Sequence, residues 1–128
     1  MRGIILDTNF LMIPFTQKVD IFSEFDRVCE FPFELFIVSR TIDEFEKIMI
    51  GQSGKDKLAA KLAMALIEAK KIKTIDVSEG HVDDLILEVA KDKGYFVATQ
   101  DKNLKKRLKK SDVPIIFLRQ KKYIVVEK

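Results

Sequence analysis

Residues that build covalent or metal cross-links are scarce in this 128-residue sequence, which has one Cys, Cys29, and one His, His81. A single thiol cannot form an internal disulfide, and one Cys with one His cannot complete a structural zinc site. The sequence therefore excludes an internal disulfide and a structural zinc site, and it favours a reducing compartment. We place His81 in a surface loop and expect no catalytic role for it.

Long hydrophobic runs and low-complexity stretches are also missing. No apolar run approaches the ~18 residues that span a bilayer, and Asp7 interrupts the N-terminal apolar stretch that a secretion signal needs. The sequence is neither repetitive nor rich in Pro or Ser, which argues against a solenoid or a disordered arm. We therefore expect one cytoplasmic domain over residues 1–128, without membrane association, and 47% apolar residues supply its core.

Charge is plentiful but unevenly distributed along the chain. Residues 101–128 carry 10 Lys and Arg against 3 acids, whereas residues 1–100 carry 13 against 17. An acidic body with a basic C-terminal quarter is a charge asymmetry that a functional interpretation has to explain.

Short apolar runs alternate with amphipathic stretches along the whole chain. Strands are predicted at 3–6, 35–38, 73–77, 95–99 and 114–118, with a sixth candidate at 123–126. Helices are predicted at 19–30, 41–50, 55–71, 82–93 and 102–110, and a loop or helix after Asp7. This alternation predicts an α/β fold, a three-layer α/β/α sandwich around a mainly parallel five-stranded sheet.

Four acids occupy equivalent places in this pattern. Asp7 directly follows the first strand, Glu44 lies in the first helical turn after the second, Asp83 opens the helix after the third, and Asp101 follows the fourth. The carboxyl ends of parallel strands meet at one edge of the sheet, where open α/β sheets bind ligands. We therefore expect the four side chains to gather there.

Each acid also has a purely structural interpretation. Asp7 and Asp101 suit helix N-caps. Thr41 and Glu44 match a capping box, and Asp83 faces the positive end of a helix dipole. For any one acid taken singly the structural interpretation is favoured, and only the combination of four points to a function.

Several carboxylates packed together repel one another unless some are protonated or a cation binds. A hard divalent cation with oxygen ligands, such as Mg²⁺, relieves this repulsion. A pair of such ions ~3.5–4 Å apart can bracket a phosphodiester and stabilise its attacking and leaving oxygens. The four acids therefore favour a metal-dependent phosphodiester hydrolase.

Four segments in order carry a family resemblance: GIILDTN (3–9), RTIDEFEKI (40–48), VDDLILEVA (82–90) and YFVATQDKNLKKRL (95–108). Together they resemble the PIN-domain ribonucleases, especially the small archaeal VapC-like proteins and the PIN nucleases that process ribosomal RNA. The resemblance implies a PIN-like fold, dependence on one or two Mg²⁺ or Mn²⁺ ions, and hydrolysis of single-stranded RNA.

The resemblance also assigns roles to individual residues. The implied catalytic residues and metal ligands are Asp7, Glu44, Asp83 and Asp101. The resemblance also implies a group of residues that surround these ligands and orient them through hydrogen bonds. They are Thr8, Asn9, Asp84, Thr99 and Asn103. Asn103 stands where many members carry a further Asp, so the number of ions stays open. For Asp84, a helix-capping role is the alternative.

The helix predicted at 102–110 is strongly basic. Its cations adjoin Asp101, and the ones we predict to bind RNA are Lys102, Lys105, Lys106 and Arg107. Such a helix can hold flanking phosphates while the acids hold the scissile one. A solvated helix face is the structural alternative. Aromatic residues suited to base stacking are few nearby, mainly Tyr123, so recognition of the RNA backbone is expected more than readout of its bases.

Several functions remain open on the sequence alone. A ribonuclease of this kind could be a toxin held by an antitoxin protein or a nuclease acting on a ribosomal RNA precursor. A PIN-like RNA-binding scaffold with weak or no catalysis is a second class. A haloacid-dehalogenase-type phosphatase is a third, disfavoured because that chemistry needs Asp-x-Asp and the chain has Asp7-Thr8-Asn9. The Phe-rich region 22–36 could bury a second copy in a homodimer, although a core role is simpler.

Overall fold

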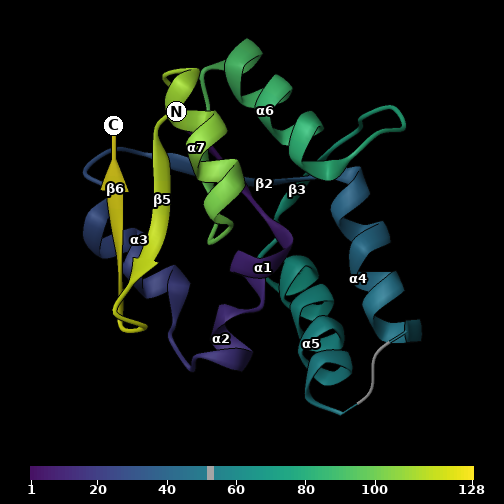
Figure 1. The fold of residues 1–128 in the computed structure, drawn as a ribbon. Helices are drawn as coiled ribbons and strands as arrows, with labels where there is room; N and C mark the ends of the chain where they lie inside the picture. The colour runs from purple at the N-terminus through teal and green to yellow at the C-terminus, as the bar shows by residue number, and fades with distance from the viewer. Residues whose placement is uncertain (52–53) are drawn as a thin grey trace.

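The computed structural model describes residues 1–51 and 54–128, and its centre is one mixed sheet (Figure 1). The strands of this sheet are β1 (Arg2–Leu6), β2 (Phe33–Val38), β3 (Lys73–Ile75), β4 (Phe96–Ala98), β5 (Ile115–Arg119) and β6 (Tyr123–Glu127). Their order is β3-β2-β1-β4-β5-β6. β1 to β5 pair in parallel and β6 pairs antiparallel with β5. The mainly parallel sheet is confirmed, but in the described residues it has six strands rather than five, because the candidate at 123–126 is an edge strand.

Helices connect the strands of the sheet. They are α1 (Thr8–Leu11), α2 (Ile13–Thr16), α3 (Ile21–Val28), α4 (Ser39–Gly51), α5 (Lys55–Ala69), α6 (Val82–Lys93) and α7 (Lys102–Lys110). The bounds of α6 and α7 are those predicted. The Asp7 side chain accepts a hydrogen bond from the first amide of α1, and Pro14 lies in the first turn of α2, where its missing N–H costs nothing.

The core forms on both faces of the sheet because side chains of β1 alternate in direction. Ile4 and Leu6 pack in a cluster with residues of α1 to α5, including the fully buried Phe10 and Phe25. Ile5 points the other way, into a cluster built with α6 and α7. Each fully buried large side chain contributes about 1.5–3 kcal/mol. The three-layer α/β/α arrangement is therefore confirmed.

The strand order changes direction beside β1. The chain builds outward from β1 through β2 to β3, and then returns through α6 to β4 on the other side of β1. The amide of Asp7, just beyond β1, donates to the carbonyl of Ala98 at the end of β4 over 2.9 Å. Such a point of reversal leaves a crevice at the carboxyl ends of the strands.

The outer edge of β6 is held by α3. The amide of Ile124 donates to Glu24 Oε1 over 2.9 Å, and Arg27 Nη2 donates to the Ile124 carbonyl over 3.3 Å. Glu24 and Arg27 also form an ion pair at 2.9 Å, and the hydrogen bond from Arg27 is the main reason why the pKa of Glu24 is lowered. Side chains of a helix thus bind backbone groups that a further strand would use.

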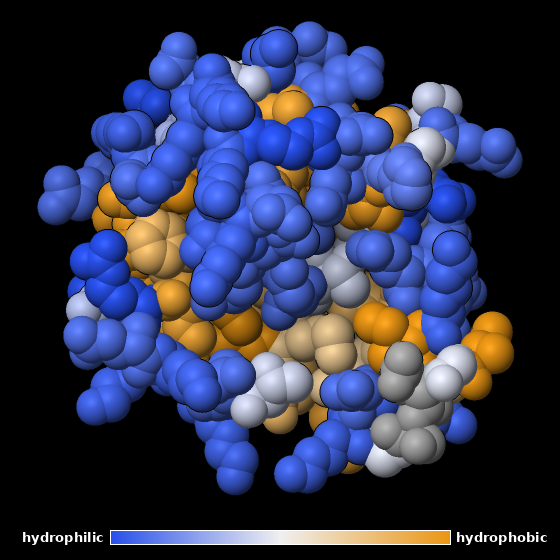
Figure 2. Space-filling view, viewed as in Figure 1, coloured by the Kyte–Doolittle hydropathy of each residue, from blue (hydrophilic) through white to orange (hydrophobic). Residues whose placement is uncertain are grey.

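The surface is polar over α6 and α7, whereas apolar atoms are exposed lower in the same view, over α5 (Figure 2). Exposed large apolar residues include Ile50, Leu58 and Leu62. Within residues 1–51 and 54–128, no helix has the length and hydrophobicity that crossing a membrane requires.

We predict that Gly3→Ala lowers the free energy of unfolding by about 1–3 kcal/mol, the usual cost of overpacking. A Cβ at this position would lie 2.6 Å from the Tyr95 ring, which is stacked on Phe36 with centroids 5.1 Å apart and cannot move freely. Urea unfolding of both proteins measures the difference.

Gly51→Ala in α4 is the control, because a Cβ there meets nothing within 4 Å. It should leave stability unchanged or raise it by up to about 1 kcal/mol, as Ala replaces Gly in a helix. Equal losses in the two variants would contradict the close-approach explanation.

Candidate functional site

Asp7 is the buried acid of the predicted site. It follows β1 at the point of reversal, and only 4% of its surface is exposed. Its carboxylate accepts hydrogen bonds from the Thr8 amide, over 2.8 Å, and from the Thr99 hydroxyl, over 2.7 Å. Burial nevertheless raises the pKa of Asp7 to about 6, because desolvation outweighs these hydrogen bonds.

Asp101 is tied to Asp7 through Thr99. The Thr99 hydroxyl that donates to Asp7 also accepts from the Asp101 amide over 3.1 Å. The Asp101 carboxylate in turn accepts from the Leu104 amide over 3.0 Å, so the N-cap interpretation is confirmed for this residue. The cap uses one carboxylate oxygen, Oδ1, so the other oxygen of Asp101 can still bind a ligand at the site.

Glu44 reaches the same edge from α4. The capping-box interpretation is wrong, because α4 begins at Ser39 and places Thr41 inside the helix. The buried Thr41 hydroxyl has no hydrogen-bond partner within the described part of the chain. Glu44 instead accepts a hydrogen bond from the Thr8 hydroxyl. Thr8 therefore contacts Asp7 through its amide and Glu44 through its side chain.

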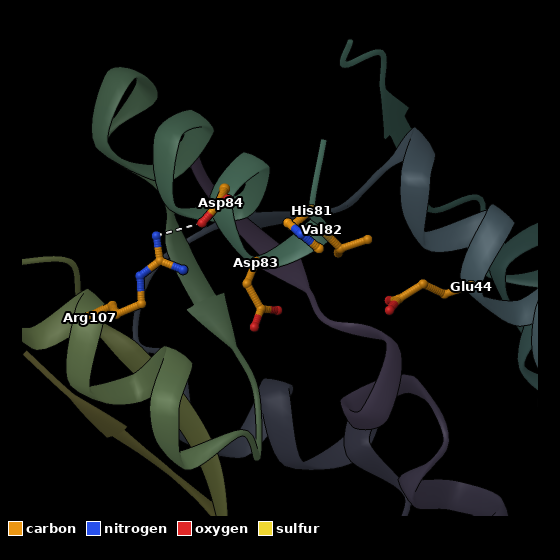
Figure 3. A pocket seen from close by; sticks show the side chains of 6 residues that line it. All are labelled: Glu44, His81, Val82, Asp83, Asp84 and Arg107. Atoms are coloured by element: carbon orange, nitrogen blue, oxygen red, sulfur yellow. Dashed lines mark ion pairs between the residues drawn. The ribbon is translucent and has the colours of Figure 1, made fainter. Parts of the chain in front are cut away.

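Asp83 and Asp84, neighbours in the first turn of α6, point in different directions. Figure 3 shows Asp83 and Glu44 reaching into the space between α6 and α4, whereas Asp84 turns toward α7. Asp84 pairs there with Arg107 at 2.7 Å. Glu44, Asp83, Asp84 and Arg107 line a pocket of about 330 Å³, to which His81 also contributes. The sequence pattern offered no signal for His81, which lines the pocket because it immediately precedes α6.

The acids interact electrostatically across this edge. Burial raises the pKa of Asp83, and the charges of Asp101 and Glu44 raise it further. Asp83 and Glu44 likewise contribute to the raised pKa of Asp7. Asp83 thus interacts with each of the other three acids, and Glu44 interacts with both Asp7 and Asp83.

This donor set can be tested for its fit to a metal. It consists of carboxylate oxygens, which suit Mg²⁺ or Mn²⁺, and a dication would relieve the repulsion that helps to raise the pKa values of Asp7 and Asp83. Within the described residues, no three His, Cys, Asp or Glu side chains already converge as a ligand group. The chemistry therefore fits a hard cation, while the acids face one another without meeting at one point.

The residues expected to support the acids divide into two groups. Thr8 and Thr99 contact the acids directly. Asn9 does so less directly: its Oδ1 accepts from the Gln100 amide over 3.2 Å and so holds the segment that leads to Asp101. Asn103 is exposed in the first turn of α7.

The basic residues of α7 have unequal freedom. Lys102 and Lys106 are exposed, whereas Lys105 is partly buried with its Nζ 4.6 Å from the Phe117 ring centroid. Burial, followed by the charges of Lys109 and Lys102, lowers the pKa of Lys105. Arg107 is held by Asp84. Of the four cations predicted to bind RNA, Lys102 and Lys106 are therefore the ones readily available to a ligand.

Gln100 is a structural residue that sequence reasoning missed. Its side chain bonds both backbone groups of Leu118: Oε1 accepts from the amide over 2.6 Å, and Nε2 donates to the carbonyl over 3.3 Å. It thereby continues the contact between β4 and β5 beyond the end of β4. No pattern in the sequence reveals this, because it depends on β5 being the neighbour of β4.

Comparison with known proteins agrees with this geometry. A family model described as a PIN-like domain matches residues 4–121. The chain belongs to the PIN-like domain family. The expected resemblance is therefore confirmed across nearly the whole chain.

Individual PIN-like relatives fall into two groups. The chain is 37% identical to "Ribonuclease VapC4" of Methanocaldococcus jannaschii, over 98% of this chain and 97% of that protein. It is 27% identical to "rRNA-processing protein fcf1" of Schizosaccharomyces pombe, over 88% of this chain and 57% of that protein. The solved structure of the PIN domain endonuclease Utp24 superimposes with a TM-score of 0.80 at 26% identity, covering 98% of this chain and 90% of that one.

We predict that stability in metal-free buffer falls between about pH 4 and about pH 6, in part because of Asp7. Its pKa is about 6 in the fold, against 3.8 ordinarily. In this window the native chain keeps a proton that the unfolded chain has released, so the free energy of unfolding declines as pH rises. The Asp7 contribution is about 3 kcal/mol.

Asp7→Asn removes this titration. Urea unfolding of both proteins at about pH 4 and about pH 7 should therefore show a smaller loss with rising pH in the variant than in the wild type. Parallel pH profiles would mean that the Asp7 carboxylate carries no such cost.

Proposed function

We propose that this chain is a metal-dependent endoribonuclease that hydrolyses phosphodiester bonds of single-stranded RNA. The observation that carries the proposal is that Asp7, Glu44, Asp83 and Asp101 gather at one edge of the sheet. Glu44 and Asp83 help there to raise the pKa of Asp7, and Asp101 and Glu44 help to raise the pKa of Asp83. The relatives named as a ribonuclease and an endonuclease support the same chemistry.

In this proposal the four acids hold one or two Mg²⁺ or Mn²⁺ ions. A bound ion of this kind polarises the scissile phosphate and activates water for attack. The chain's own contribution is to fix the acids beforehand. Thr99 holds Asp7 and the Asp101 amide together, and Thr8 holds Glu44 beside them. Carboxylates restrained in this way lose less entropy on binding a cation.

RNA recognition is assigned to the basic side of the site. Lys102 and Lys106 are exposed on α7, directly after Asp101, and can neutralise phosphates that flank the cut. Lys105 and Arg107 belong to the same group, although each already has a partner, the Phe117 ring and Asp84 respectively. Asp84 and Asn103 have no ligand role in this proposal.

Two biological settings follow from the two groups of relatives. The relative named VapC4 favours a toxin restrained by an antitoxin protein, and the rRNA-processing relative favours a ribosomal RNA precursor as substrate. The antitoxin, the precursor and a homodimer all stay predictions. A PIN-like scaffold that binds RNA without cutting it is the alternative function, disfavoured because the four acids are retained.

We predict that Asp7→Asn lowers cleavage of single-stranded RNA by about 100-fold or more, the scale of losing a metal site or its preorganisation. The assay compares single-stranded RNA with DNA of the same sequence, with added Mg²⁺ and with a chelator. Cleavage should occur with RNA and Mg²⁺ and should disappear in the chelator.

Asp112→Asn is the matched control. Asp112 is exposed and precedes the amino end of β5, whereas the four acids lie at the carboxyl ends of the strands. Its φ is positive, 57°, a conformation that Asn tolerates. This variant should cut RNA like the wild type. Full activity of Asp7→Asn, or undiminished activity in chelator, would end the metal-dependent proposal.

We predict that replacing both Lys102 and Lys106 by Gln weakens RNA binding and reduces the slope of log K against log salt by about 1–2, since roughly 0.7 is lost per phosphate contact with a single strand. Binding is measured by fluorescence anisotropy in the Asp7→Asn background, where the RNA stays intact.

The control removes the same charge from α5, with Gln at both Lys57 and Lys61. These lysines are exposed and lie on a helix of the other layer. If the two double variants change the salt slope equally, α7 makes no particular contribution.

A further inference from the structure

A second pocket of about 330 Å³ opens beside the acids and differs from the first in chemistry. Its walls combine apolar side chains with side-chain amides: Met12, Ile13 and Leu118 with Asn9, Gln17 and Gln100. Its described lining contains no acid, and its one charged member is Lys121. The pocket therefore suits an uncharged, flat group attached to something anionic.

Its position relative to the acids is fixed by short covalent and hydrogen-bonded links. Asn9 lies two residues beyond Asp7 in the first turn of α1, and Gln100 lies between Thr99 and Asp101. The backbone amide of Gln100 donates to Asn9 Oδ1 over 3.2 Å, and the Thr99 hydroxyl next to it in sequence donates to Asp7. The residues that shape the pocket thus alternate in sequence with those that shape the acidic edge.

The polar groups of this pocket are already oriented. Because Asn9 Oδ1 is used by Gln100, the hydrogens of Asn9 Nδ2 are what this side chain offers to a ligand. Gln100 is itself fixed by its hydrogen bonds to both backbone groups of Leu118. A preorganised wall of this kind gains specificity because little side-chain entropy is lost on binding.

We infer that this pocket receives an unpaired nucleobase of the RNA, from a nucleotide directly flanking the phosphate that is cut. The inference rests on the proposed ribonuclease function and adds a specificity site to it. Sequence-specific RNA recognition uses bases splayed out of a single strand, packed against flat side chains and hydrogen-bonded along their edges. The described lining has no aromatic ring or guanidinium for stacking, so the apolar side chains of Met12 and Leu118 pack against the face of the base instead. Asn9 Nδ2 donates to the edge of the base, and Lys121 neutralises an adjoining phosphate.

The test maps every cut in a fixed unstructured RNA that contains all base combinations. Wild type should prefer particular bases at one position next to the cut by about three- to tenfold, the worth of one or two hydrogen bonds.

Thr16→Trp should flatten this preference to less than about twofold, because Thr16 is an exposed residue of the pocket wall and the larger side chain fills the space. Gln17→Leu, which removes an amide with little change of size, should alter the order of preferred bases.

Lys61→Trp is the matched control, with the same bulk added at an exposed site on α5. It should keep the wild-type pattern. Cleavage by wild type without any base preference, or an unchanged preference in both Thr16→Trp and Gln17→Leu, would overturn the base pocket while leaving the ribonuclease proposal intact. Failure of wild type to cut any RNA would instead overturn the proposed function, and the base pocket with it.

Discussion

A hydrogen bond of 2.7 Å between the Thr99 hydroxyl and the Asp7 carboxylate joins the ends of β1 and β4. These strands are neighbours at the point where the strand order reverses, so this contact adds a side-chain tie to their backbone pairing, directly at the site. The same hydroxyl accepts from the Asp101 amide. One buried side chain therefore fixes two acids that are almost a hundred residues apart, and the cost of burying Asp7 depends on keeping that donor.

The free-energy cost of burying the charged Asp7 carboxylate affects the whole site. Hydrogen bonds to Asp7 favour its charged form, yet desolvation and the neighbouring acids raise its pKa to about 6. The fold supplies hydroxyl and amide partners at this edge, whereas Arg107, the cation that lowers the pKa of Asp83, is paired with Asp84. In the described part of the chain, none of the four acids forms an ion pair with a Lys or Arg, so the site keeps negative charge that an external cation can bind.

Much of the fold could be predicted because its signals are local. The apolar faces and terminal residues of α6 and α7 define those helices, and buried strands read as short apolar runs. The short helices α1 and α2 could not be predicted from hydrophobic periodicity, because four residues are too few to show a helical repeat. Thr41 shows the limit of motif reasoning, since the helix begins at Ser39 and the expected capping box does not form. Gln100 acts through Leu118 of a strand that follows it in sequence, and only the three-dimensional pairing reveals this.

The contact between α3 and β6 has a consequence for how other molecules can approach. Glu24 and Arg27 saturate the outward-facing backbone groups of Ile124, and the opposite margin of the sheet ends in the three-residue β3. Neither margin offers a long row of open peptide groups, so growth of the sheet by a strand from another chain is disfavoured at both. Macromolecules that associate with this domain are therefore expected to engage its helices or the rim where the strands end, and the four acids lie at that rim.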